Sequence, residues 1–426
     1  MIYQRVKGML DYVGEEAAKF RYIEKCFTEE IKKYGFREII TPVLENTEVF
    51  VRSSGEESDI VEKEMYTFTD KGRRSLTLRP EGTAGVVRSF IENKLYARPE
   101  PEKLYYFAPM FRYSRPQAGR YRQFYQFGVE VFGDVSPLLV ADLIASGDKI
   151  LKRLGIKDII LKINSIGDFS SREAYADRLR AHFAAHRDGL CEDCRRRLDK
   201  NPLRVLDCKA DSDHPAVIAA PSIADCLSAE AQEYFRKVRA GLDLLGVKYE
   251  ADSRLVRGLD YYTDIVFEYI YEGDNVYRGL AAGGGGNYAD LVSSFGGPDI
   301  PGVGYAMGLE RILGIMEEQN LFPALDSGLV VAVIGLDEAS KEKSLQVASL
   351  LREAGYRCEL DYAKTALKPQ FRLADRAGAG AIVIIGEEER KNNVLTVKNA
   401  KTKNQETIPE ENLLAYLKEI ENENGI

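Results

Sequence analysis

The pattern of apolar residues near the start of the chain predicts a helix followed by a strand. Residues 14–33 place apolar side chains three and four apart, at Phe20, Ile23, Phe27 and Ile31. This spacing predicts an amphipathic helix, which Gly35 ends. The segment REIITPVLE (37–45) then indicates a strand, with Pro42 at an edge or a bend because proline cannot donate to a sheet.

Two short strands and a second helix are expected next. Residues 65–69 and 75–79 flank a turn signal, and RPEGTAGVVRSF (79–90) begins a helix. Thr83 is expected to be the N-cap of that helix. Glu81 lies two residues before it, so a carboxylate and a hydroxyl could both accept hydrogen bonds from an ammonium group. The alternative role of both residues is helix capping alone.

Residues 105–133 predict a hairpin. Segments 105–111 and 123–132 are rich in aromatic and β-branched residues, which favour strands, and Pro116 and Gly119 indicate the loop between them. Strand residues two apart share a face, so three positions point the same way: Gln126, Gly128 and Glu130. A glycine between two polar residues leaves room for a ligand to lie flat on the sheet.

The hairpin loop is basic. Four arginines lie on or beside it, and Glu130 is the one acid in the stretch: Arg112, Arg115, Arg120 and Arg122. Arginines at one end of a hairpin and a carboxylate at the other suit a nucleotide together with a second small substrate. A solvated basic hairpin without a ligand is the alternative.

The centre of the chain changes character. Residues 138–154 predict an amphipathic helix, and residues 170–250 are helical and charged between strand-rich flanks such as 261–271, which indicates a helical insertion domain. The glycines at 283–286 lack the Gly-Lys-Ser/Thr of a P-loop, so close approach of the backbone to a flat ligand is expected. A glycine-spaced strand then enters a helix that carries Arg311.

A separate α/β module follows Pro323 and the linker ALDSG. Helices at 338–354, 370–377 and 410–419 alternate with strands at 329–335, 357–360, 381–386 and 394–398. This order predicts a small mixed or parallel sheet with covered faces. Taken alone, the module suits ligand binding or dimerisation.

Composition narrows the class of protein. A chain of 426 residues predicts two or three domains, and no apolar run approaches the ~18 residues of a membrane span. The first residues show no secretory signal, so a cytoplasmic protein is expected. A net charge of −8 argues against unspecific coating of nucleic acid but allows a local basic surface. With three histidines in all, chemistry based on arginine, glutamate, tyrosine and backbone is expected.

Six cysteines in a chain of this length do not indicate a disulfide scaffold. Cys191, Cys194 and Cys208 could form a tetrahedral zinc site with His214 or Cys226. The second half of this group lacks a paired spacing, so free buried thiols are the favoured interpretation.

The hairpin sequence FRYSRPQAGRYRQFYQFGVEVFG resembles the second signature motif of class II aminoacyl-tRNA synthetases, in the form seen in histidyl-tRNA synthetases. The segments around Pro42 and Arg311, and RGLDYYT with AAGGGGNYADLV, agree with it. The resemblance implies an α+β class II fold. An antiparallel-sheet catalytic domain at 1–325, with the helical insertion at about 170–250, would precede an α/β anticodon-binding domain at 326–426. It also implies a homodimer built on the first helix and the proline-bearing strand.

The resemblance further implies activation of histidine by ATP with Mg²⁺, followed by transfer to the 3′ end of tRNA(His). It places Arg112 and Arg257 at the α-phosphate and Arg311 with Mg²⁺ at the β- and γ-phosphates. The implied histidine-binding residues are Glu81, Thr83 and Gln126 at the α-amino group and Glu130, Tyr262 and Tyr288 at the imidazole. The residues implied at the tRNA acceptor end are Arg115, Gln117, Arg120 and Arg122.

Two segments depart from the family pattern. Ser114 stands where the second motif usually has a glutamate that meets adenine, and Asn287 and Ala289-Asp290 replace charged positions of the glycine-rich segment. A catalytically impaired relative is therefore the alternative, such as a histidine-binding regulatory subunit of ATP phosphoribosyltransferase. A class II synthetase for another amino acid is a third hypothesis, against which RGLDYYT argues.

Overall fold

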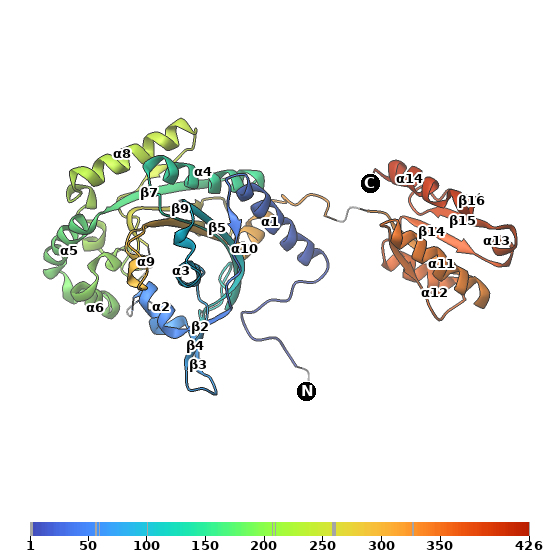
Figure 1. Ribbon diagram of the computed structural model, residues 1–426, viewed down its shortest axis with the longest axis horizontal. Helices are drawn as coiled ribbons and strands as arrows, with labels where there is room; N and C mark the ends of the chain where they lie inside the picture. Colours follow the sequence, from blue (N-terminus) through green and yellow to red (C-terminus); the bar gives the residue numbers. More distant parts are fainter. Residues whose placement is uncertain are drawn as a thin grey trace. The chain divides into compact units, whose positions relative to one another are not determined.

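The computed structural model describes residues 3–55, 58, 60–99, 101–206, 208, 210–257, 261–325 and 328–425. The chain divides into two compact units, Met1–Pro323 and Ala324–Ile426, and Figure 1 draws the elements of both. None of the helices in these described ranges is long and apolar enough to cross a membrane.

An eight-stranded sheet forms the centre of the first unit. Its order is β1-β5-β6-β11-β10-β9-β7-β8, and only the two edge pairs, β1 with β5 and β7 with β8, are parallel. The strands are β1 (Arg37–Glu38), β5 (Glu102–Phe111), β6 (Gln123–Phe132), β7 (Ile159–Gly167), β8 (Glu250–Ala251), β9 (Thr263–Tyr271), β10 (Ala281–Tyr288) and β11 (Gly302–Gly308).

Four helices cover one face of this sheet: α1 (Glu15–Lys32), α4 (Pro137–Arg153), α8 (Ala229–Leu244) and α10 (Leu309–Glu318). Their apolar sides form the main core with Phe127, Val129 and Phe267 of the sheet. Because side chains alternate along a strand, Gln126, Gly128 and Glu130 point to the opposite face. The helices therefore leave the predicted ligand-binding face of β6 to other elements.

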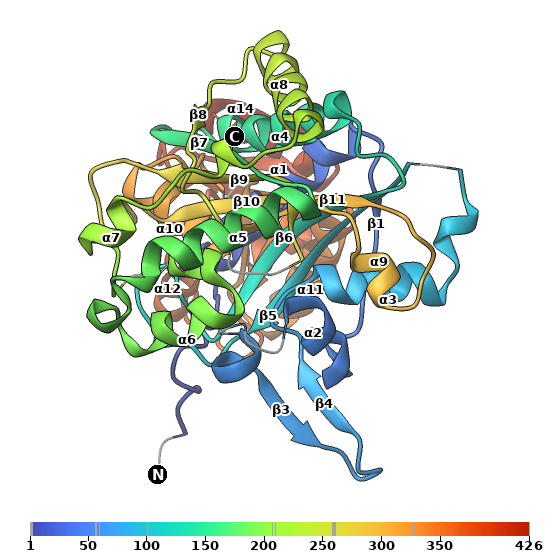
Figure 2. The same ribbon diagram turned by 90° about the vertical axis from the view of Figure 1, so that its left-hand side faces the viewer.

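A smaller three-stranded sheet, in the order β2-β4-β3, lies beside the large one (Figure 2). Its strands are β2 (Leu44–Asn46), β3 (Tyr66–Thr69) and β4 (Ser75–Leu78), with helices α2 (Thr47–Ser54), α3 (Thr83–Glu92) and α9 (Leu291–Ser294) and the π-helical turn Ile60–Glu64 nearby. The single strand expected at 37–45 is wrong. Pro42 lies in a non-strand stretch that separates β1, in the large sheet, from β2, in the small one.

The helical segment between β7 and β9 has a core of its own. Its helices are α5 (Phe169–Ala184), α6 (Glu192–Lys200) and α7 (Pro215–Ile218), with short 3₁₀ turns at Arg187–Gly189, Pro202–Val205 and Ile223–Asp225. Leu179 and Phe183 pack there with Cys194. Helix α8, the last of the segment expected as an insertion, instead contributes Val238 and Leu242 to the main core beside α4.

The second unit is a mixed five-stranded sheet in the order β13-β12-β14-β15-β16. Its strands are β12 (Val330–Gly335), β13 (Arg357–Leu360), β14 (Ala381–Ile385), β15 (Val394–Asn399) and β16 (Gln405–Pro409), and its helices are α11 (Glu338–Glu353), α12 (Leu367–Arg376), α13 (Glu387–Asn392) and α14 (Leu413–Asn424). Helices α11 and α14 pack on one face of the sheet and α12 on the other. No sequence pattern predicted β16, a mostly exposed edge strand with polar residues, or the short helix α13.

Candidate active site

The register of the β5–β6 hairpin sets the layout of the site. Tyr106 lies opposite Gly128, and Leu104 lies opposite Glu130. A β-carbon at Gly128 would meet the Tyr106 ring at 2.1 Å, so this glycine accommodates a tyrosine of the neighbouring strand. The expected space above Gly128 for a flat ligand is therefore filled by Tyr106. Sequence reasoning missed Tyr106, although an aromatic residue facing a strand glycine is the signal that would have found it.

Glu130 is buried at the centre of this face, with 1% of its surface exposed. Its Oε1 accepts a 2.7 Å hydrogen bond from the Thr83 hydroxyl, and its Oε2 accepts a 2.5 Å hydrogen bond from the Tyr288 hydroxyl. Burial raises the pKa of Glu130 to about 8, against the effect of these two donors. The two donors thus hold the carboxyl group in place against the cost of its burial.

Glu81, rather than Thr83, caps helix α3. The Glu81 carboxylate accepts hydrogen bonds from the backbone N–H groups of Thr83 and Ala84, at 2.7 and 2.9 Å. Thr83 is the first helical residue, with Gly82 at the N-cap, so the expected N-cap role of Thr83 is wrong and its hydroxyl is free to reach Glu130. Burial raises the pKa of Glu81, while the backbone donors of α3 oppose that shift.

Three tyrosines from two distant segments, Tyr261 and Tyr262 before β9 and Tyr288 at the end of β10, surround the two carboxyl groups. The Tyr261 ring lies edge-on to the Tyr288 ring, with centroids 5.8 Å apart, and 4.5 Å from the Tyr262 ring. Burial, the neighbouring Tyr262 and the charges of Glu81 and Glu130 raise the pKa of Tyr261. Tyr261 therefore belongs to the same polar cluster, although sequence reasoning singled out Tyr262 alone from this pair.

Arg112 and Arg257 approach the cluster from two sides. Arg112 Nε donates a 2.8 Å hydrogen bond to the Pro80 carbonyl, and burial lowers the pKa of Arg112. Arg257 pairs with Glu268 of β9 and lies over Gly284, where a β-carbon would come within 2.8 Å of its Nη1. Burial alone would lower the pKa of Arg257, but the charge of Glu268 raises it.

Arg311 brings a third guanidinium group to the same region. Its Nε donates to the Gly119 carbonyl of the hairpin loop at 3.1 Å, and its Nη1 donates to the Ala281 carbonyl of β10 at 2.6 Å. Burial lowers the pKa of Arg311 first, followed by the positive charges of Arg112 and Arg120. Buried like charges that depress one another's pKa favour the binding of a polyanion between them.

The predicted tRNA-binding residues of the hairpin loop are of two kinds, exposed residues and residues that contact other side chains. Arg115 and Gln117 are exposed. Arg120 forms an ion pair with Glu64 at 2.5 Å and so faces the arginine cluster. Arg122 lies 4.0 Å from the Tyr113 ring centroid, and its backbone N–H donates to the carbonyl of residue 8. Glu64 and Glu268, the carboxylate partners in this cluster, were not singled out from the sequence.

Two of the departures from the family motifs, Ser114 and Asn287, occupy buried positions. Among the described residues, the Ser114 hydroxyl and Oε1 of Gln126 are buried without a hydrogen-bond partner. Asn287 Nδ2 donates at 2.8 Å to the hydroxyl of Tyr234, so this residue ties β10 to α8. Residues 258–260, in the middle of RGLDYYT, lie outside the described residues.

The helical insertion contacts the site through the backbone of Tyr262. Arg172 Nη1, on α5, donates a 2.9 Å hydrogen bond to the Tyr262 carbonyl. A small cavity lies at this junction, lined by Ile166, Arg172, Asn201, Leu203, Arg204, Val256, Arg257 and Tyr262.

An antiparallel sheet that carries buried carboxyl groups and three converging arginines on one face, joined to a mixed α/β unit, defines a class II aminoacyl-tRNA synthetase. The family models agree: residues 8–312 match "Histidyl-tRNA synthetase", and residues 330–420 match "Anticodon binding domain". The chain belongs to the histidyl-tRNA synthetase family.

Relatives match over the full length. The chain is 45% identical over 421 residues to a histidine–tRNA ligase of Anoxybacillus flavithermus, covering 99% of this chain and 100% of the relative. It is also 45% identical to that of Bacillus subtilis, covering 94% and 95%. The apo histidyl-tRNA synthetase of S. aureus superposes with a TM-score of 0.84 at 38% identity, over 97% of this chain and 99% of that one.

These matches decide between the hypotheses drawn from the sequence. The activity is the ligation of histidine to tRNA, and ATP is a substrate. A Bacillus halodurans structure described as an ATP phosphoribosyltransferase regulatory subunit/histidyl-tRNA synthetase is 21% identical with a TM-score of 0.66, which shows a shared fold alone. The names of the full-length relatives therefore support the ligase over the regulatory subunit.

Proposed function

We propose that Glu130 and the three arginines divide one surface between histidine and ATP. The histidine carboxylate displaces pyrophosphate at the α-phosphorus and forms histidyl-adenylate, and the histidyl group then passes to the 3′ end of tRNA(His). The observation that carries this proposal is the convergence of Arg112, Arg257 and Arg311 beside a buried, hydrogen-bonded Glu130.

The amino-acid half rests on the buried carboxyl groups. Glu130, with Tyr262 and Tyr288, meets the two imidazole nitrogens, which require one donor and one acceptor when the imidazole is neutral. Glu81, Thr83 and Gln126 hold the α-amino group. The buried Oε1 of Gln126 supports this role, because among the described residues it has no hydrogen-bond partner and an ammonium group would supply one.

The nucleotide half rests on charge. Displacement at phosphorus needs positioning and charge neutralisation more than a proton acceptor, so Arg112 and Arg257 bind the α-phosphate and Arg311 binds the γ-phosphate. Mg²⁺ takes oxygen ligands from one or two carboxylates together with substrate phosphates, and Glu64 and Glu268 place carboxylates in this cluster. When bound, the ion would neutralise charge on the β- and γ-phosphates.

The proposed contacts with tRNA begin at the hairpin loop. Arg115 and Gln117 are exposed there and would contact the acceptor end, with Arg120 and Arg122 behind them.

A homodimer is part of the same proposal, because apolar side chains are exposed beside β1: Ile40, Val43 and Leu44 are 87%, 37% and 41% exposed. The enzyme would act in the cytoplasm, where ATP and tRNA are available.

Exchange of labelled pyrophosphate into ATP tests the proposal. Exchange is expected with histidine and to remain at background with the other amino acids, and charging of tRNA(His) should follow. Tight histidine binding without exchange would contradict the ligase chemistry and favour a regulatory protein. Mass photometry or sedimentation at micromolar concentration tests the dimer separately.

A further inference from the structure

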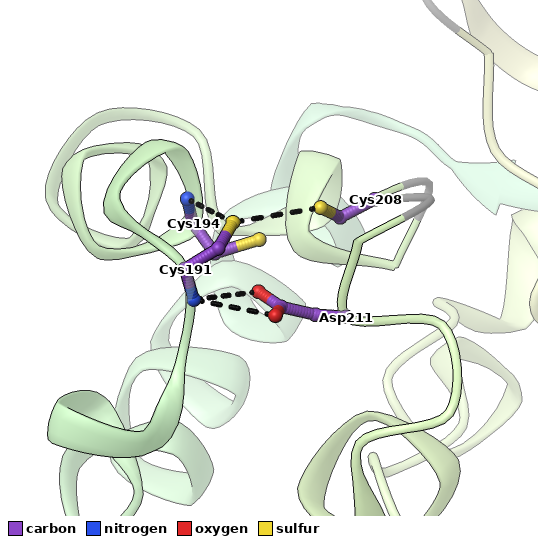
Figure 3. A group of neighbouring side chains, drawn as sticks. All are labelled: Cys191, Cys194, Cys208 and Asp211. Atoms are coloured by element: carbon purple, nitrogen blue, oxygen red, sulfur yellow. Dashed lines mark hydrogen bonds between the residues drawn. The ribbon is translucent and has the colours of Figure 1, made fainter.

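Four side chains of the helical insertion cluster away from the active site. Cys191 and Cys194 come from the start of α6, and Cys208 and Asp211 come from the loop that follows the next 3₁₀ turn (Figure 3). One ligand atom from each residue lies within 4.8 Å of all the others, and three of the four side chains are buried. The synthetase chemistry described above uses none of them.

One distance between sulfur atoms indicates the chemistry of this cluster. The sulfur atoms of Cys191 and Cys208 are 3.7 Å apart. A disulfide requires about 2.05 Å. Two thiolates on one tetrahedral zinc ion, each about 2.3 Å from the metal, would be ~3.8 Å apart. We propose that Cys191, Cys194, Cys208 and Asp211 bind a structural zinc ion.

The structure selects Asp211 as the fourth ligand in place of the two candidates suggested by the sequence. His214 caps α7, with Nδ1 accepting from the Ala216 N–H, and Cys226 lies 3.9 Å from Arg178 outside the cluster. His214 and Cys226, which the sequence suggested as alternatives for a fourth ligand, are therefore not part of the proposed site. Asp211 is 7% exposed, and its carboxylate accepts from the Cys191 N–H at 3.0 Å.

The local backbone already suits bound thiolates. Cys191 is the N-cap of α6, and its sulfur accepts a 3.4 Å hydrogen bond from the Cys194 N–H. Thiolate is the form that binds metal, and a bound cation would hold these buried thiols in that form. Thiolates select zinc over magnesium or calcium, and four protein ligands leave no open coordination position. The bound ion would therefore have a structural role.

Because of where α6 lies, an ion bound there would also affect the rest of the unit. Lys63 pairs with Asp193 at 3.5 Å and Glu62 with Arg196 at 3.1 Å, so α6 is fastened to the π-helical turn. That turn ends at Glu64, the partner of Arg120 in the arginine cluster. A zinc ion that fixes α6 would thereby fix one wall of the nucleotide region.

Metal analysis of the full chain, purified reduced and without a metal-affinity tag, tests the proposal. About one zinc ion per chain is expected by mass spectrometry. Cys208→Ser and Asp211→Asn should each lower zinc at least about tenfold, whereas the control Cys226→Ser should retain it. Zinc below about a tenth of an ion per chain in the wild type, or equal loss in the control, would overturn the assignment.

Cobalt substitution covers the case in which Cys208→Ser fails to fold. The unmodified chain, stripped by a chelator and reloaded with Co²⁺, should show the visible bands of tetrahedral thiolate coordination, and zinc should displace them. Asp211→Asn should alter these bands, while His214→Ala should leave them in place. Absent bands, or bands lost only in His214→Ala, would refute the four-residue site.

Discussion

The Tyr288 hydroxyl on β10 donates a 2.5 Å hydrogen bond to Oε2 of Glu130 on β6, across the intervening strand β11. The Thr83 hydroxyl donates to the other carboxylate oxygen, so both oxygens of Glu130 are held in place before any substrate binds. A prepositioned acceptor loses little freedom when a ligand binds, which favours selectivity for the ligand that matches it.

Replacing Glu130 by glutamine tests that selectivity. Glu130→Gln should lower kcat/KM for histidine in pyrophosphate exchange about 100-fold, because an amide offers one oxygen where the carboxylate offers two acceptors. Tyr288→Phe should have a smaller effect of about tenfold. Glu102→Gln, a buried glutamate on the adjoining strand β5, is the matched control and should leave exchange near the wild-type rate. A control that loses as much activity would show a general loss of folding.

Glu130 should also make stability depend on pH. Its pKa rises to about 8 in the folded chain from an ordinary value of 4.5, so the folded state retains a proton that the unfolded state releases. The resulting stability is fully present below about pH 4.5 and is lost as the pH rises to 8. In urea titrations, the difference in the free energy of unfolding between the wild type and Glu130→Gln should fall by more than about 1 kcal/mol between pH 5 and pH 8. A constant difference would contradict the raised pKa.

Arg257 should act in the chemical step. Arg257→Ala removes a guanidinium group next to the proposed α-phosphate, and kcat for exchange should fall about 10²–10³-fold while KM for histidine changes little. Arg254→Ala, an exposed arginine three residues earlier, serves as the control. Equal losses in both variants would argue against a specific role for Arg257.

Gly304 tests the packing beneath Glu130. A β-carbon there would come within 2.0 Å of Oε2 of Glu130 and 2.4 Å of the Val129 carbonyl. Gly304→Ala should therefore destabilise the fold by about 1–3 kcal/mol and abolish histidine binding. Gly85→Ala in α3, whose nearest contact would be 3.5 Å, should be neutral or slightly stabilising in thermal unfolding. Similar unfolding temperatures for the two variants would contradict this account.

Arg115 separates the two half-reactions. Arg115→Ala should leave pyrophosphate exchange unchanged and raise KM for tRNA about tenfold in aminoacylation, with a smaller effect as salt is increased. Gln117→Ala should show the same pattern more weakly. Loss of exchange in Arg115→Ala would place this side chain at ATP instead.

Patterns confined to one element predicted most of the fold. The strand at 123–132 agrees with β6 residue for residue, since its turn signals and β-branched residues are local. Features that depend on a partner strand or helix were missed. Tyr106 fills the space at Gly128, Glu81 takes the capping role expected of Thr83, and Asp211 joins the cysteines. No regular spacing in the sequence marks any of these contacts, because each depends on tertiary packing.

The glycine-rich strands at the site carry a thermodynamic cost. Six glycines at 283–286, 302 and 304 leave no space for a β-carbon, since their nearest neighbours would lie at 2.0–2.6 Å. Glycine loses more backbone entropy on folding than alanine, by roughly 0.5–1 kcal/mol in a strand. These two strands therefore weaken the sheet by several kcal/mol, which the aromatic core beneath α1 and α4 must offset. Mutations that loosen that distant core should consequently reduce the supply of folded enzyme before they alter its chemistry.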